Sequence, residues 1–159
     1  MSEKDQNDKK IEKKDLKDYL MKEIDTIQSI INRMGNNSFL IKGWTITLVV
    51  GTLLLERTLL TDSKLQITVA FVPLLVFWFL DAYFLWQERM YRKLYDWVVT
   101  NRLNTDDELF SMNAYRFRSK VDSRPKIMFS FTLGWLYGSI FALLVIYEIL
   151  ICYFSTVNT

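Results

Sequence analysis

The stretch that decides the fold is ITVAFVPLLVFWFLDAYFLW, residues 67–86. Twelve of its first nineteen residues are Leu, Ile, Val or Phe, and at roughly −0.3 to −0.6 kcal/mol each they favour membrane insertion by about 4–7 kcal/mol. A charged residue at the centre of a span opposes insertion by ~3 kcal/mol. Asp81 opposes it by less, because it lies away from the centre of the stretch. A spanning helix needs ~20 apolar residues, so we predict that residues 67–86 cross a membrane.

Two further apolar stretches lie on either side of this one. Residues 127–154 are longer than a bilayer requires, so we expect the helix to tilt or to begin as an interfacial turn. Residues 39–55 are shorter, and they span only if the Lys42 side chain extends toward the head groups. A chain of 159 residues is too short to bury three such stretches in a soluble core. The sequence therefore predicts an all-α membrane protein with three transmembrane helices and a cytoplasmic helical part.

The lysines and arginines predict the orientation. Nine precede or begin the first span, two lie in the connection 56–66, nine lie in 87–126 and none follows the third span. Because cytoplasmic segments carry the excess of positive charge, we expect a multi-pass protein of the bacterial inner membrane with its N-terminus in the cytoplasm and its C-terminus outside. The expected segments are a cytoplasmic N-terminal helix (1–38, with 1–15 disordered or a frayed helix), a transmembrane hairpin (39–86), a cytoplasmic helical region (87–126), the third transmembrane helix (127–154) and an outside tail (155–159).

An apolar seam marks the end of the N-terminal segment. Its members recur at intervals of four, three, four and three, which is typical of a coiled coil: Leu20, Ile24, Ile27, Ile31 and Met34. The seam either pairs with other copies of the chain or packs on an extension of the second span, whose stripe is Tyr91, Leu94, Tyr95 and Val98. Residues 35–37 (GNN) predict a helix stop or hinge, and residues 105–108 (TDDE) have the spacing of a capping box that starts another short helix.

Ionisable residues inside a membrane are candidate functional residues. Asp81 and Lys42 are expected at nearly the same depth on neighbouring antiparallel spans, so they predict either an ion pair or a ring of Asp81 carboxylates at the mouth of an oligomeric pore. Glu148, near the outer end of the third span, is expected either to meet Arg57 or to form a second ring.

Small residues recur at intervals of four on two of the spans. Gly134, Gly138 and Ala142 form such a face on the third span, and Gly43 and Gly51 repeat the spacing on the first. Small side chains allow helices to approach closely in lipid. These faces predict packing inside the three-helix unit or, where a face is left over, between copies.

Composition argues against catalysis. The chain has no histidine, one cysteine and five glycines, and it has no phosphate-binding loop or metal-ligand motif. We therefore expect a protein that is not an enzyme and has no cofactor. Residues 115–126 are basic and carry aromatic side chains, which favours contact with anionic lipid over nucleic acid.

Two groups of residues resemble small uncharacterised bacterial inner-membrane proteins with three spans. The first group is INRM (31–34) with NSF (37–39) and KGW (42–44). The second is FWFLDAY (77–83) with QER (87–89), and the resemblance covers residues 24–154. It implies no activity and no site residues, but the architecture is analogous to that of membrane-damaging effectors of anti-phage systems.

From these observations we expect an oligomeric inner-membrane effector that permeabilises or depolarises the membrane. A cytosolic sensor protein or a small signal would activate it. The alternative is a non-conducting membrane anchor or scaffold subunit that recruits a cytosolic partner.

Overall fold

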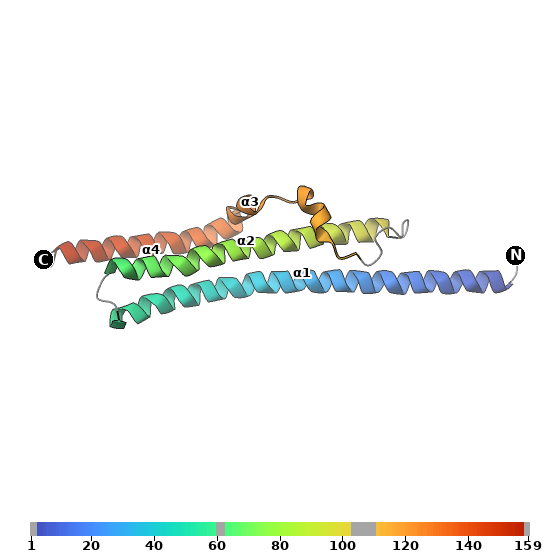
Figure 1. The fold of residues 1–159 in the computed structure, drawn as a ribbon, viewed down its shortest axis with the longest axis horizontal. Coiled ribbons are helices and arrows are strands. Elements are labelled where there is room, and N and C mark those ends of the chain that lie inside the picture. The colour runs from blue at the N-terminus through green and yellow to red at the C-terminus, as the bar shows by residue number, and fades with distance from the viewer. Residues whose placement is uncertain (1–2, 60–62, 103–110, 158–159) are drawn as a thin grey trace. The chain divides into compact units, whose positions relative to one another are not determined.

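The structure is a computed structural model that describes the backbone of residues 3–59, 63–102 and 111–157 and the side chains of 16–54, 69–102 and 111–153. Every regular element of the described part is a helix and none is a strand, which confirms the predicted fold class. Its elements are α1 (Glu3–Leu59), α2 (Ser63–Asn101), the 3₁₀ helix η1 (Ala114–Lys120), α3 (Arg124–Met128) and α4 (Phe131–Val157) (Figure 1).

Helix α1 differs from the sequence prediction in two places. It begins at Glu3, where we expected disorder or a frayed helix through residue 15, and it continues through residues 35–37, where we expected a stop or hinge. A glycine inside a helix costs only ~1 kcal/mol relative to alanine. The apolar contacts of Ile27 on one side and Ile41 on the other, both buried, favour continuing the helix. Packing on both sides thus overrides the local signal.

Helix α2 runs from Ser63 through the second apolar stretch to Asn101, so it includes the predicted extension of the second span. Pro73 lies inside it. Proline removes one backbone hydrogen bond, and neighbouring helices make this tolerable in a transmembrane helix. The predicted helix start at residues 105–108 lies outside the described residues.

The third apolar stretch begins with a separate short helix. In α3, Pro125 occupies one of the first two helical positions, where its missing N–H is no loss, and Ile127 is fully buried. A break at Phe129 and Ser130 then leads into α4. A turn at this position agrees with the expectation that the third span is too long to be one straight crossing.

The chain divides into two compact units. The charged unit consists of Met1–Met34 and Gln87–Val121, and the apolar unit consists of Gly35–Trp86 and Asp122–Thr159. Helices α1 and α2 each contribute residues to both. The division at residues 86 and 87 falls where the sequence predicts the end of the transmembrane hairpin.

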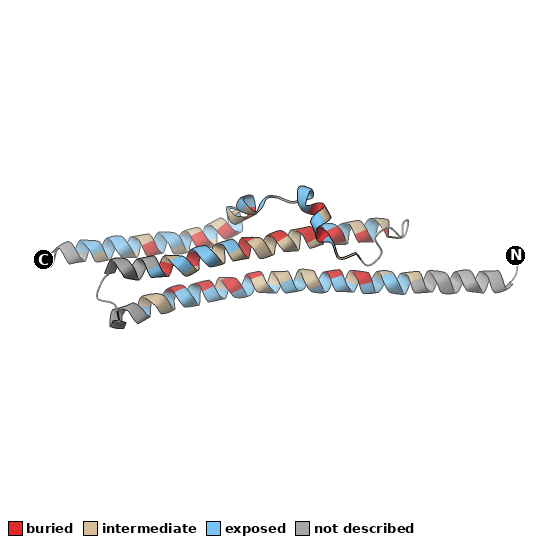
Figure 2. Cartoon of the chain, viewed as in Figure 1, coloured by how far each residue is buried: buried red, intermediate tan, exposed pale blue. Residues whose placement is uncertain are grey.

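The apolar unit buries one stripe of each long helix and exposes apolar side chains elsewhere (Figure 2). Its core contains Ile41, Val49, Ala70, Leu74, Leu133 and Leu144. Large apolar side chains such as Phe39, Leu54 and Leu143 are exposed, an arrangement that suits lipid and not water. In the described part, α1, α2 and α4 are long and apolar enough to cross a membrane, so the protein is a multi-pass membrane protein.

Candidate functional site

Asp81 is the centre of a polar cluster in the apolar unit. It lies in α2, five residues before Trp86, which places it about 7 Å along the helix from the end of the apolar stretch. Its exposed fraction is 0%. A carboxylate removed from solvent in this way requires partners for its charge and for its lone pairs.

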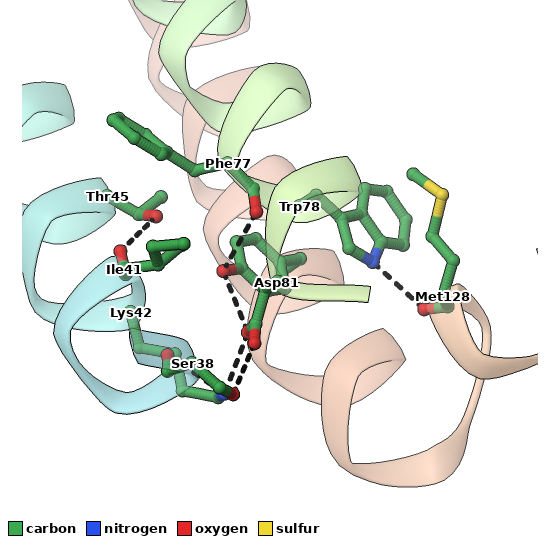
Figure 3. Close-up of polar contacts among 9 residues, drawn as sticks. Ser38, Ile41, Lys42, Thr45, Phe77, Trp78, Asp81 and Met128 are labelled. Atoms are coloured by element: carbon green, nitrogen blue, oxygen red, sulfur yellow. Dashed lines mark hydrogen bonds and ion pairs between the residues drawn. The ribbon is translucent and has the colours of Figure 1, made fainter. Parts of the chain in front are cut away.

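Helix α1 supplies two of these partners. Ser38 and Lys42 are one helical turn apart, so both side chains lie on the same face of α1. Lys42 Nζ lies 2.7 Å from Asp81 Oδ2, and the Ser38 hydroxyl donates to Asp81 Oδ1 (Figure 3). Lys42 Nζ also donates to Ser38 Oγ at 2.7 Å. The ion pair expected from the depths of Lys42 and Asp81 is therefore present, and Ser38 connects its two members.

Helix α4 supplies the third partner. The Tyr137 hydroxyl donates to Asp81 Oδ2 at 3.0 Å, and the Tyr137 residue is fully buried. Its ring stacks on Trp78 with the centroids 5.7 Å apart and the planes 8° from parallel. Trp78 Nε1 in turn donates to the Met128 carbonyl oxygen at 2.9 Å (Figure 3). Side chains of α1, α2 and α4 thus meet at one carboxylate.

The energetics of this cluster favour a specific arrangement more than high stability. Desolvating two charges offsets much of their mutual attraction, and apolar residues of similar volume often give equal or greater stability. Lys42 relieves part of this penalty, because its side chain remains 25% exposed. Removing one member alone leaves a charge without its partner, which is strongly unfavourable. We therefore expect the cluster to favour one packing of the three helices over others.

The second predicted charge pair is not formed by described atoms. Glu148 is exposed on α4, and among the side chains that the structure describes none makes an ion pair with it. The Arg57 side chain lies outside the described part, so the pairing of Glu148 with Arg57 stays a prediction.

The predicted small-residue faces are largely uncovered by the residues that the structure describes. A Cβ atom added at Gly43, Gly51 or Gly138 would have nothing within 4 Å. At Gly134 it would meet only the backbone of Phe129, at an ordinary contact distance of 3.7 Å. Ala142 is exposed. Apart from the contact at Gly134, both faces are uncovered among the described residues, and uncovered faces are where the sequence predicts contacts between copies.

The predicted seam packs within its own chain. Ile27 is fully buried, and Leu20, Ile24, Ile31 and Met34 are half-buried. The α2 extension presents a matching buried stripe of Met90, Leu94 and Val98, and Gln28 Nε2 donates to the Tyr95 hydroxyl at 3.4 Å. Within a single copy the seam therefore packs in the charged unit, and its pairing with other copies stays a prediction.

A second buried ion pair was not predicted. In the charged unit, Arg102 Nε and Nη2 donate to the two Glu23 carboxylate oxygens at 2.8 and 2.5 Å, and each side chain is 1% exposed. Arg102 also lies over the Trp97 ring, 5.2 Å from its centroid, and Arg116 of η1 lies 4.1 Å from the same centroid. The sequence contains a pattern that indicates this pair. Glu23 lies one helical turn before Ile27, Arg102 lies one helical turn after Val98, and the two residues carry opposite charges.

The chain matches no family model, no curated protein and no solved structure. Within the described residues no group of three histidine, cysteine, aspartate or glutamate side chains is arranged to hold a metal ion. The Asp81 cluster and the exposed faces of the spans are therefore the features that point to a function.

Proposed function

We propose that the protein is an oligomeric effector of the bacterial inner membrane, and that a cytosolic partner or small signal triggers it to permeabilise or depolarise the membrane. The observation that carries this proposal is the fully buried Asp81, which holds Ser38 and Lys42 of α1 and Tyr137 of α4. Buried charges within spans are typical of functional positions. In this proposal the cluster maintains the closed packing of a single copy.

The unused small-residue faces supply the second part of the proposal. Once the Asp81 cluster opens, the stripes at Gly43 and Gly138 allow close contact between helices of different copies. Because α1 carries Lys42 and also residues of the charged unit, a partner that binds the charged unit acts on the helix that holds the ion pair. The orientation that we infer, with the N-terminus in the cytoplasm, exposes the charged unit to such a partner.

The test is membrane leakage. We expect Asp81→Asn to raise dye release from liposomes that contain the purified chain and to depolarise cells that express it, because Lys42 loses its anionic partner. The double variant Asp81→Asn/Lys42→Met removes both charges and should return leakage to the wild-type level. Equal, low leakage from all three proteins would refute the effector proposal. Comparing infected and uninfected cells in the same assay tests the anti-phage setting implied by the architectural analogy.

A non-conducting anchor or scaffold is the second candidate. The observation that favours it is the internal pairing of Asp81 and Lys42, which leaves neither charge to line a pore in the structure. In this alternative the charged unit recruits a cytosolic partner and the spans only hold it at the membrane. A loss of stability in Asp81→Asn with no increase in leakage, together with a stable complex between the chain and a cytosolic protein, would favour the anchor.

A further inference from the structure

We propose that α3 and the start of α4 form a binding site for an anionic phospholipid of the surrounding bilayer. The site, which we call the elbow, consists of residues 124–135. It combines two cationic side chains with three large exposed aromatic side chains, and these two groups lie at different depths. The proposal does not depend on whether the spans conduct.

The elbow is held firmly on α2. The Met128 carbonyl oxygen accepts a hydrogen bond from Trp78 Nε1 at 2.9 Å, and Ile127 is fully buried. The Phe129 ring meets Trp78 edge to face, with the centroids 5.4 Å apart. A binding site on a fixed element loses little conformational entropy when a ligand orders it.

Its contacts with α2 show that the elbow is inclined in depth. The Arg124 guanidinium lies over the rings of Trp86 and Tyr83, 4.5 and 5.9 Å from their centroids. Phe129 contacts Trp78, eight residues earlier in α2, which corresponds to about 12 Å along the helix axis. The cationic end therefore lies at the edge of the apolar stretch, at the level of the head groups, and the aromatic end lies at the level of the acyl chains.

The aromatic end faces outward. Phe129 is 70% exposed, Phe131 86% and Trp135 75%, and the last two rings stack with centroids 6.4 Å apart. The wholly apolar Phe129 and Phe131 rings suit contact with acyl chains, and Trp135 adds a ring of the kind that is enriched near the boundary between lipid and water. These three rings form a platform for the upper part of an acyl chain.

The cationic end favours a negatively charged head group. Lys126 Nζ pairs with the Asp122 carboxylate at 2.6 Å, so Arg124, Lys126 and Asp122 together keep a net positive charge. A guanidinium whose face rests on aromatic rings presents its N–H groups at its edge, the geometry that binds a phosphate through two hydrogen bonds. Anionic phosphatidylglycerol adds a net negative charge to this contact, whereas zwitterionic phosphatidylcholine does not. Charge complementarity thus selects the anionic lipid.

The experiment is native mass spectrometry of the full chain in detergent, titrated with phosphatidylglycerol or phosphatidylcholine. We expect wild-type protein to retain phosphatidylglycerol in preference to phosphatidylcholine. Arg124→Gln should bind phosphatidylglycerol about fivefold more weakly, the effect of one basic residue near an anionic surface. Lys126→Gln should act in the same direction, and its 72% exposed side chain makes unfolding an inadequate explanation.

Arg92→Gln is the matched control, because Arg92 is an exposed arginine of the charged unit that makes one ion pair, with Glu88, one helical turn away. The same charge change there should leave lipid retention unaltered. Equal retention of the two lipids by wild-type protein, or equal losses in Arg92→Gln and Arg124→Gln, would overturn the proposal.

Discussion

The Asp81 carboxylate accepts hydrogen bonds from Ser38 of α1 and Tyr137 of α4 and forms an ion pair with Lys42 of α1. The amide of Asp81→Asn keeps an oxygen acceptor but leaves the Lys42 ammonium without a counter-charge. We expect this variant to unfold at lower temperature in detergent, with a loss of about 2–3 kcal/mol. This is somewhat less than for a fully buried pair, because Lys42 is partly exposed. Circular dichroism during thermal unfolding measures the effect.

The double variant Asp81→Asn/Lys42→Met is the control for this prediction. It should recover most of the lost stability, because both charged groups are removed and no unpaired charge remains. Lys93→Met breaks the exposed pair between Lys93 and Asp96 and should change nothing measurable. If the double variant were as unstable as Asp81→Asn, charge pairing would not be the reason for the effect.

At the scale of the elements, Gly43 of α1 and Gly138 of α4 lie on small-residue faces, and no described neighbour comes within 4 Å of a Cβ atom added at either position. A leucine at Gly43 or Gly138 meets open space within the chain, so Gly43→Leu and Gly138→Leu should leave the unfolding temperature unchanged or slightly raised. The same side chains prevent close approach between helices of two copies. We expect a lower oligomer fraction in native mass spectra of both variants.

The control for this experiment is Val50→Leu, which enlarges an already large, exposed side chain of α1. It should leave the oligomer fraction at the wild-type level. Oligomers that persist unchanged in both glycine variants would exclude the small-residue faces as the interface.

At the scale of the whole molecule, the distribution of lysine and arginine predicts that the two ends of the chain lie on opposite sides of the membrane. Cys152 is the single cysteine, so Cys152→Ser provides a background without thiols. In that background we expect Asn158→Cys to react with a membrane-impermeant maleimide in intact cells, and Ser2→Cys to react only after lysis. Labelling of the position-2 thiol in intact cells would reverse the predicted orientation.

The sequence was sufficient for the fold class, and it predicted the Lys42–Asp81 pair as one of two alternatives, beside a ring of Asp81 carboxylates. Long apolar stretches specify spanning helices through composition alone, and two opposite charges at equal depth on adjacent antiparallel spans have few other partners. Tyr137 was not predicted as the third partner, because a tyrosine in an aromatic-rich span does not show which helix it faces. The same applied to Glu23 and Arg102, which lie 79 residues apart and meet only when two stripes pack in a particular register.

The sequence by itself determined which segments lie in lipid and which lie in water. The free energy of transferring side chains from water into the membrane adds up along a segment, independently of what that segment contacts. What only the tertiary structure decided is which faces meet. The seam of Leu20–Met34 packs on α2, the helix continues through residues 35–37, and the glycine faces stay uncovered. These outcomes depend on complementarity between distant surfaces, which local residue patterns do not encode.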